Sequence, residues 1–470
     1  MSYPSGEQTV WLPDFVYTGG RFESGVALAC DASGRITGLT REIENAGRVV
    51  RLKNRAMLPG LVNAHSHAFQ RVIRGRTERR TSEHDSFWTW REMMYSAATR
   101  LGPEEIYTAS RMAFLEMALS GITSVGEFHY IHRAPDGSAY TDANLLAKSV
   151  IRAARDVGLR IALLRVAYAR SGYRTPANER QARFIEADVE DYLRNVESLK
   201  TELARAEPRE AWVGLAPHSV RAVPLSYLRE VARYAEGEND LSLHMHVAEQ
   251  PAEISACLEE SGRTPVELLD SEHLLTENFT GVHAIHITPE EARSLARARA
   301  IVCACPTTER NLGDGIIPTD LLFKEGVAIA LGTDSHAQID LLEDARELEY
   351  HLRLQKLTRA VLAPADGDSA SALAGRLFDC ATVNGALSIN APGGKLEPGR
   401  PADFFMVDLD DSSIAGAGAA DLLSCIVFGL ARTAIREVFV GGKQIISEGQ
   451  HVAQQETIEN FAALQRKLWS

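Results

Sequence analysis

The stretch Leu58-Pro59-Gly60-Leu61-Val62-Asn63-Ala64-His65-Ser66-His67 joins a short apolar run to a pair of histidines. Side chains alternate along a strand with a period of two, so His65 and His67 lie on the same face. Both imidazoles can therefore reach one metal ion from the end of a buried strand. Alone, the pair is weak evidence, because two surface histidines fit the same spacing. The rest of the chain decides between these interpretations.

Two later apolar runs also end in residues that bind metals. His246 lies in His244-Met245-His246-Val247-Ala248-Glu249, and Asp334 lies in Ala330-Leu331-Gly332-Thr333-Asp334-Ser335. Three imidazole nitrogens and a carboxylate oxygen form the ligand set expected for catalytic zinc with an open coordination position. The alternative for Asp334 is the N-cap of a following helix. The three histidines favour the ligand assignment.

Short apolar runs recur along the middle of the chain and predict strands. They cover residues 56–63, 122–128, 160–167, 211–216, 243–247, 281–287, 300–305 and 327–332. Helical patterns separate most of them, at 103–120, 144–157, 185–206 and 225–235. This alternation implies a parallel sheet, and eight repeats predict an α/β fold, a (β/α)8 TIM-like barrel. Polar residues collect after the carboxyl ends of the runs, where barrel enzymes build active sites: His65, His67, Glu127, His129, His218, His246, Glu249, His283, Thr307, Glu309 and Asp334.

Both ends of the chain have a different sequence pattern from the middle. From about residue 10 to 57, and again near 402–407 and 437–443, short β-like runs alternate with turns rich in Gly and Asp. We therefore expect a small β-sandwich domain built from both termini, with its N-terminal part at 1–57 and its C-terminal part at 393–452. The barrel is expected at 58–392, and the apolar spacing near the end predicts a C-terminal helix at 453–470.

Composition narrows the classes of function. A chain of 470 residues, 45% of them hydrophobic, can bury a large core. The formal net charge of -13 argues against general affinity for nucleic acid or acidic membranes. No apolar stretch approaches membrane-spanning length, the N-terminus shows no secretion signal, and the six cysteines include no Cys-x-x-Cys pair. We therefore expect a cytoplasmic protein, with Cys303 and Cys305 in a buried strand rather than in a disulfide.

One local exception to the negative charge is a group of arginines just after the histidine pair. The group comprises Arg71, Arg74, Arg76, Arg79 and Arg80. We expect a solvated basic loop. The alternative is that these side chains help to attract an anionic substrate.

In these elements the chain resembles the amidohydrolase superfamily over nearly its whole length. The resemblance covers the split β domain, His65-Ser66-His67, His246 with Glu249, His283 and Asp334. More narrowly, the chain is similar to the formimidoylglutamate deiminases of bacterial histidine breakdown. That similarity rests on four segments: His65-Ser66-His67-Ala68-Phe69-Gln70-Arg71, Asp85-Ser86-Phe87-Trp88-Thr89-Trp90-Arg91, Pro217-His218-Ser219-Val220-Arg221 and Cys305-Pro306-Thr307-Thr308-Glu309. Arg310 departs from the pattern, because a small residue is expected there.

The resemblance implies one Zn²⁺ per chain, with Fe²⁺ or Mn²⁺ as alternatives, bound by His65, His67, His246 and Asp334. Such an ion lowers the pKa of a bound water towards neutrality. A two-metal member would also need a bridging lysine or carboxylate after the fourth strand, where this sequence reads Leu215-Ala216-Pro217-His218. We therefore expect one metal, and His283 is then free to orient or deprotonate the water.

Two carboxylates are expected to move protons. Asp334 is both a ligand and a base near the water, while Glu249 can protonate the departing nitrogen, which is otherwise a poor leaving group. The alternative for Glu249 is a surface residue at the start of the next helix.

Gln70, Arg91, Tyr130, His218 and Arg221 are carried by the resemblance into substrate-binding roles. Two arginines and a histidine suit a small substrate with two carboxylates. The implied reaction is the hydrolytic deimination of N-formimino-L-glutamate to N-formyl-L-glutamate and ammonia in histidine degradation, by a homodimer. The alternatives are a deaminase of a nucleobase or other cyclic amidine, and a non-catalytic scaffold on the same barrel.

Overall fold

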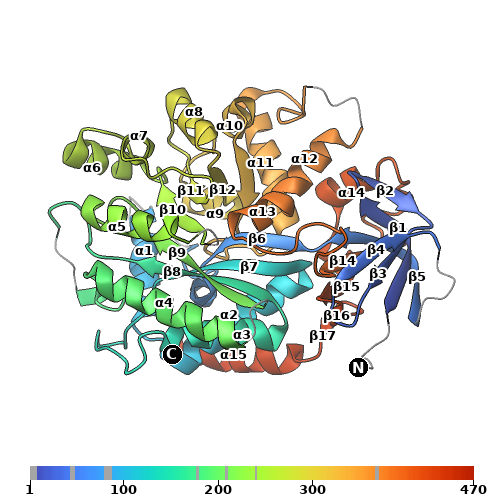
Figure 1. Ribbon diagram of the computed structural model, residues 1–470, viewed down its shortest axis with the longest axis horizontal. Helices are drawn as coiled ribbons and strands as arrows, with labels where there is room; N and C mark the ends of the chain where they lie inside the picture. Colours follow the sequence, from blue (N-terminus) through green and yellow to red (C-terminus); the bar gives the residue numbers. More distant parts are fainter. Residues whose placement is uncertain are drawn as a thin grey trace.

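The computed structural model describes residues 8–42, 48–78, 87–175, 179–206, 210–238, 241–365 and 370–470. Within these residues an eight-stranded parallel sheet forms the centre of the molecule (Figure 1). Its strands are β6 (Leu61–Ser66), β7 (Ile122–His129), β8 (Arg160–Ala167), β9 (Ala211–Pro217), β10 (Leu243–Val247), β11 (Phe279–His283), β12 (Ile301–Ala304) and β13 (Ala328–Leu331). A bridge from Ser66 to Asp334 joins the two outer strands, so the predicted barrel is confirmed.

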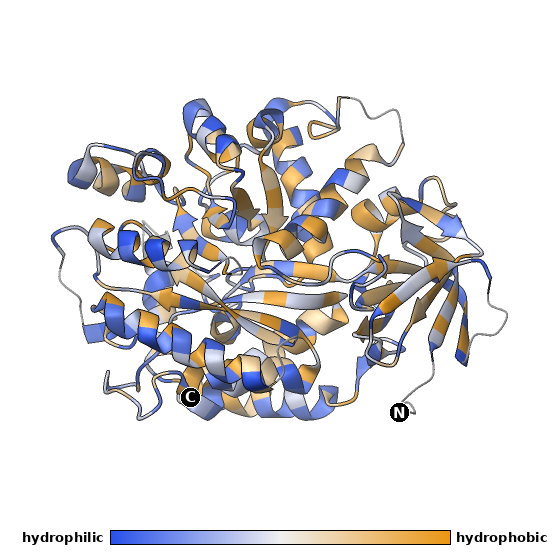
Figure 2. Cartoon of the chain, in the orientation of Figure 1, coloured by the Kyte–Doolittle hydropathy of each residue, from blue (hydrophilic) through white to orange (hydrophobic). Residues whose placement is uncertain are grey.

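Amphipathic helices surround the barrel and turn their apolar faces towards it (Figure 2). In α3, for example, Leu146, Val150 and Val157 are buried, and the helix ends at Gly158 in the left-handed conformation. The helices are α1 (Phe87–Ala98), α2 (Pro103–Leu119), α3 (Leu145–Val157), α4 (Val189–Ala206), α5 (Leu225–Glu236), α6 (Pro251–Ser261), α7 (Pro265–Ser271), α8 (Pro289–Arg297), α9 (Pro306–Leu312), α10 (Thr319–Glu325), α11 (Leu341–Lys356), α12 (Ala372–Cys380) and α13 (Val383–Ser388), with 3-10 turns η1 (Ala68–Ile73), η2 (Glu179–Gln181) and η3 (Arg432–Ala434). Across the described residues, none of the helices is both long and apolar enough to span a bilayer.

A second sheet is assembled from both ends of the chain, as predicted. Its described strands are β1 (Thr9–Thr18), β2 (Arg21–Ser24), β3 (Ala27–Cys30), β4 (Ile36–Thr40), β5 (Arg48–Pro59), β14 (Phe404–Asp408), β15 (Ile435–Val440), β16 (Lys443–Ser447) and β17 (Gln450–His451). β5 pairs in parallel with β1 and antiparallel with β14, so blue and red strands lie side by side in Figure 1. Two helices complete this part of the chain, α14 (Leu422–Gly429) and α15 (Gln454–Trp469).

The first predicted barrel strand is in fact two strands. β5 extends past the expected boundary at residue 57 to Pro59, which pairs with Phe404 in the small sheet, and β6 begins the barrel at Leu61. Gly60 lies between them and packs so closely against Thr123 that no Cβ fits there. α4 likewise begins at Val189 rather than at 185 because the Asp188 side chain accepts a hydrogen bond from the N–H of Glu190.

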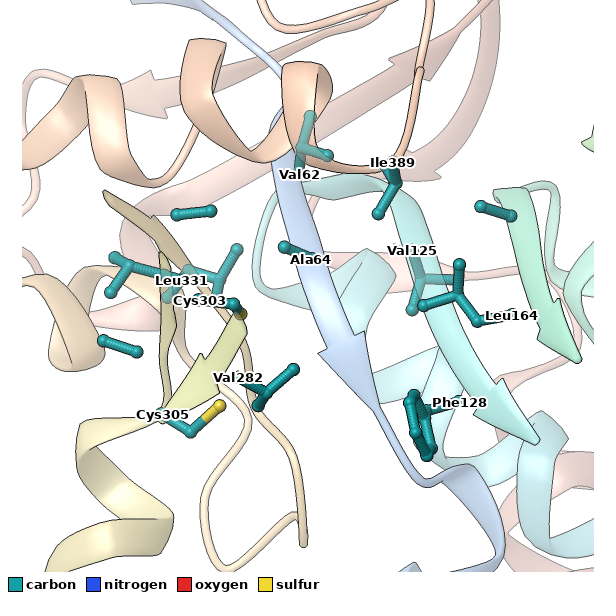
Figure 3. Packing of buried hydrophobic residues seen from close by; sticks show 14 of the residues in the cluster. Val62, Ala64, Val125, Phe128, Leu164, Val282, Cys303, Cys305, Leu331 and Ile389 are labelled. Carbon is teal, nitrogen blue, oxygen red and sulfur yellow. The ribbon is translucent and has the colours of Figure 1, made fainter. Parts of the chain in front are cut away.

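Apolar side chains fill the inside of the barrel. Figure 3 shows Val62 and Ala64 of β6 facing Val125 of β7, with Val282 and Leu331 opposite. Phe128, in the lower part of Figure 3, lies near the carboxyl end of β7 and contacts the rings of His65 and His246, with centroid distances of 5.0 Å and 4.6 Å. The polar residues at the carboxyl ends of the strands therefore stand on a closed apolar floor. Both Cys303 and Cys305 are buried free thiols, as predicted.

The expected solvated arginine loop is wrong for its first two members. Arg71 and Arg74 are largely covered and both bind the carboxylate of Glu116 on α2, each at 2.6 Å. Arg76 is exposed and stacks over the ring of Trp469 on α15. Arg79 and Arg80 lie outside the described residues. Arg71 and Arg74 therefore serve to attach η1 to its neighbours, because their charges are satisfied internally.

Candidate active site

The four predicted metal ligands converge at the carboxyl end of the barrel. His65 and His67 leave β6, His246 lies in β10, and Asp334 follows β13. All four are buried, and one nitrogen or oxygen atom from each lies within 4.8 Å of the others. Asp334 Oδ1 is 3.3 Å from His65 Nε2 and 3.2 Å from His67 Nε2. The four side chains thus surround a single point.

Hydrogen bonds from outside this group fix the imidazole orientations. His67 Nδ1 bonds the carbonyl oxygen of Phe128 at 3.0 Å, and His246 Nδ1 bonds that of His218 at 3.3 Å. Each ring therefore presents Nε2 to the centre.

The protonation states also suit a cation. Burial lowers the pKa of His65 to about 3 and holds that of His246 well below its ordinary value, so both rings are neutral and their lone pairs are free. Burial opposes ionisation of Asp334, but the close contacts of its carboxylate with His65 and His67 hold its pKa well below the ordinary value. Neutral imidazoles beside a carboxylate are the donor set that Zn²⁺ and similar ions prefer, so the residues fit a divalent cation.

The backbone around the centre is strained. Asp334 has φ +42° and His283 has φ +73°, in the left-handed region that side chains other than glycine seldom adopt. Asp334 is held there by two backbone hydrogen bonds, from its N–H to His65 O at 3.1 Å and from His67 N–H to its own carbonyl at 3.0 Å. The loop after β13 is thereby locked against the histidine pair.

His283 lies between two carboxylates beside the four ligands. Its Nε2 is 3.6 Å from Glu249 Oε1 and 3.9 Å from Asp334 Oδ2, while its Nδ1 is 3.2 Å from Glu309 Oε1. Burial lowers the pKa of His283, but Glu249 and the other carboxylates raise it well above the ordinary value. Burial raises the pKa of Glu249 to about 7. These two groups can therefore exchange a proton near neutral pH.

A second group of potential ligands, His283, Cys305 and Glu309, lies deeper. Burial raises the pKa of the Cys305 thiol well above its ordinary value, so a thiolate ligand is disfavoured. Glu309 Oε1 already accepts the Cys305 N–H at 2.9 Å as well as bonding His283. These contacts make Glu309 a support for the His283 ring.

The five predicted substrate-binding residues come together with three of the four ligands, His67, His246 and Asp334, around one pocket. Its lining includes His67, Gln70, Trp90, Arg91, Met94, Tyr95, Tyr130, Tyr168, Phe184, His218, Arg221, His246, Glu249, Leu312 and Asp334. A wider outer hollow shares Arg91, His218, Arg221, His246 and Glu249, and opens between residues 171–175 and α6. The ligand centre therefore lies at the bottom of a pocket that reaches the surface.

Two guanidinium groups converge on one wall of this pocket. Arg91 and Arg221 each donate to the Tyr168 hydroxyl at 3.4 Å. Arg91 is further held by Tyr95 OH at 2.6 Å, and Arg221 by the carbonyl of Ser171 at 2.9 Å. Two fixed cations in one pocket select an anionic ligand.

Another part of the pocket wall offers neutral polar groups. Gln70 Nε2 donates to Tyr130 OH at 2.8 Å, whereas the buried Gln70 Oε1 has no hydrogen-bond partner among the described residues. The His218 ring stacks on His246 with centroids 4.9 Å apart, and burial together with Arg221 holds its pKa well below the ordinary value. This wall thus presents a free acceptor beside a neutral imidazole.

Some features of the site had no predicted role. Tyr168 comes directly after β8, and Glu309 closes a segment quoted for the resemblance, so position after a strand was the available signal for both. The aromatic segment forms α1 from Phe87 onward and carries Arg91 to the pocket; Asp85 and Ser86 lie outside the described residues. Arg310 pairs with Glu347 on α11 and is not among the residues that line the pocket.

Known proteins resemble this chain over both the barrel and the small sheet. Residues 56–445 match the model of the amidohydrolase family. The formimidoylglutamate deiminase of Pseudomonas aeruginosa is 37% identical over 86% of this chain and 88% of its own length. A 5-methylthioadenosine/S-adenosylhomocysteine deaminase of Pyrococcus abyssi is 26% identical over 88% of each chain. The crystal structure of an amidohydrolase from Brucella melitensis superposes with a TM-score of 0.90 at 32% identity, covering 98% of this chain and 100% of that one.

Proposed function

The chain belongs to the amidohydrolase family, and on this premise we propose that it hydrolyses N-formimino-L-glutamate to N-formyl-L-glutamate and ammonia. The observation that carries the proposal is the pair Arg91 and Arg221, which meet at Tyr168 in the pocket that also holds the metal-ligand group. A substrate with two carboxylates satisfies both cations. A neutral nucleobase offers neither of them a carboxylate.

The family and the convergent donors support a divalent metal, and we propose one Zn²⁺ held by His65, His67, His246 and Asp334. Such an ion supplies Lewis acidity, polarising the formimino group and lowering the pKa of a water ligand towards neutrality. The remaining chemistry falls to side chains of this chain.

Substrate binding is assigned to the two pocket walls. Arg91 and Arg221 pair with the carboxylates, and His218 lies between them and the centre. Gln70 Oε1, a buried acceptor without a described partner, receives an N–H of the formimino group. These contacts hold the formimino carbon over Asp334, which lines the same pocket.

Proton transfer is assigned to the three groups joined through His283. Asp334 takes the proton of the attacking water as the new C–O bond forms. His283 lies within 4 Å of both carboxylates and can relay that proton towards Glu249. Glu249, whose pKa of about 7 keeps much of it protonated at neutral pH, donates to the terminal nitrogen. The C–N bond then breaks and ammonia leaves, while the new hydroxyl group gives its proton to Asp334 as the carbonyl of the formyl product forms.

An ammonia-release assay on the zinc-loaded protein tests the proposal. Formiminoglutamate, cytosine, guanine and adenosine are compared by kcat/KM. We expect formiminoglutamate to be preferred by on the order of 10⁴-fold, because a site built to bind the charged groups of its substrate strongly rejects an analogue that lacks them. Preference for a nucleobase or nucleoside would establish the alternative deaminase. Absence of turnover on all of them by the metal-loaded protein would favour a non-catalytic role.

A further inference from the structure

A buried carboxylate forms hydrogen bonds with the segment that carries the histidine pair. Glu127, in β7, is 1% exposed and is not among the residues that line the pocket. Its Oε2 accepts the hydroxyl of Ser66 at 2.5 Å, and its Oε1 accepts the N–H of Ala68 at 2.8 Å. Ser66 lies between the two histidine ligands and Ala68 follows the second. Both oxygens of one side chain therefore hold this short segment.

The same network continues to the loop that carries Asp334. Ser66 Oγ is 3.1 Å from His336 Nε2, and His336 Nδ1 is 3.1 Å from Thr333 Oγ1. Thr333 Oγ1 in turn accepts from Asn63 Nδ2 at 2.7 Å. The chain of hydrogen bonds thus begins on β6, crosses the loop after β13 and returns through Ser66 to β7.

A backbone contact fixes the orientation of the first side chain in this chain of hydrogen bonds. Thr333 N–H donates to Asn63 Oδ1 at 3.0 Å, so the Asn63 amide nitrogen must face Thr333 Oγ1. The Ser66 hydroxyl donates to Glu127 Oε2, and the Ala68 N–H donates to Glu127 Oε1. In this arrangement Ser66 Oγ can accept from His336 Nε2–H, and His336 Nδ1 can accept the Thr333 hydroxyl proton.

We propose that Glu127, acting through Ser66 and His336, is a positioning residue that sets the geometry and affinity of the metal centre. The proposal rests on the metal-dependent function proposed above. The network ties together the ends of β6 and β13, which supply His65, His67 and Asp334. It also secures two left-handed residues of that loop, Asp334 at φ +42° and His336 at φ +59°. Groups that support metal ligands from outside typically change metal affinity by about 10- to 100-fold when removed.

Glu127→Gln is the sharpest test, because it keeps the shape of the side chain but replaces one acceptor oxygen with an amide donor. Zn²⁺ affinity of the metal-free protein is measured by competition with a chromophoric chelator, and the Co²⁺-substituted protein is examined by its absorption spectrum. We expect Zn²⁺ binding to weaken by about 10- to 100-fold and the Co²⁺ bands to shift. Circular dichroism verifies that the variant is folded.

Glu349→Gln is a matched control. Glu349 on α11 is also fully buried, and both of its oxygens also accept hydrogen bonds, from the N–H groups of Val361 at 2.9 Å and Leu362 at 2.8 Å; it pairs with Arg353 at 2.6 Å as well. It lies outside the network and the pocket lining. We expect this variant to lose thermal stability yet to bind Zn²⁺ as the wild type does, which separates loss of a buried carboxylate from loss of positioning.

Ser66→Ala and His336→Asn break the network at other points, and Asn tolerates the left-handed backbone of residue 336. Both should weaken Zn²⁺ binding in the same direction, and they replace Glu127→Gln if that variant does not fold. Wild-type affinity and an unchanged Co²⁺ spectrum in a folded network variant would overturn this inference alone. A wild-type protein that binds neither Zn²⁺ nor Co²⁺ would overturn the proposed function, and this inference with it.

Discussion

Arg221→Met should impair turnover of formiminoglutamate far more than turnover of an uncharged analogue. Arg221 is held at the pocket by the Ser171 carbonyl at 2.9 Å and by Tyr168 OH at 3.4 Å, so a carboxylate meets a pre-positioned guanidinium. Losing one partner of a desolvated charge pair costs roughly 2–5 kcal/mol. At about 1.36 kcal/mol per tenfold change, kcat/KM should fall by about 30-fold to several thousand-fold.

The assay compares two substrates in two variants. Ammonia release is followed with formiminoglutamate and with N-formimino-n-butylamine, which has no carboxylate. For the uncharged compound we expect kcat/KM of Arg221→Met to lie within a few-fold of wild type, because that compound never paired with Arg221. Arg229→Met is the control: this arginine pairs with Glu272 on the surface and does not line the pocket, so both substrates should be unaffected.

Equal losses on the two substrates would refute the reasoning, because Arg221 would then support the pocket rather than bind a carboxylate. A double comparison of this kind removes general damage to the fold from the measured interaction.

Four further outcomes are expected. His67→Ala should lose activity and most of its metal while keeping its circular dichroism spectrum, since this ligand lies above the apolar floor. Elemental analysis of the wild-type protein should show one divalent metal per chain, and two equivalents would contradict the single centre. Glu249→Gln should retain metal but lose about 10²- to 10⁴-fold in kcat, because an amide cannot donate the proton. His283→Asn should also keep metal and lose turnover, and loss of metal would instead make His283 a ligand. Because burial raises the pKa of Glu249 to about 7, its proton is lost as pH rises through that value; kcat should therefore decline on the alkaline side, and a rate that stays flat to pH 9 would remove Glu249 as the donor.

The metal-ligand group was predictable because its signals are local. Strand periodicity places His65 and His67 on one face, and parallel strands bring their carboxyl ends, and hence His246 and Asp334, to one side of a barrel. The close approach of their atoms in the structure follows from this geometry. The small sheet was predictable for the same reason, since turn residues punctuate short apolar runs at both ends of the chain.

The contacts that could not be predicted from the sequence involve residues that are far apart in the chain. The break at Gly60 was hidden because both flanking strands are apolar, and only the packing of Thr123 requires glycine. Arg71 and Arg74 read as a solvated cluster because nothing nearby identifies Glu116 as their partner. Glu309 acquires its role only when β12 brings it beneath His283. Charge and periodicity alone do not encode these contacts.

The pairing of β5 with β14 has a consequence for how the chain reaches its native state. Pro59 and Phe404 are separated in sequence by the whole barrel, so they can pair only after that segment has folded back on itself. Closing so long a loop slows folding. Until then one edge of β5 is open to pairing with other molecules. Its outer half carries exposed charges at Arg48, Arg51 and Lys53, which discourage such pairing. We therefore expect apolar replacements at these three positions to lower the yield of refolded protein at high protein concentration while leaving the activity of the folded fraction unchanged.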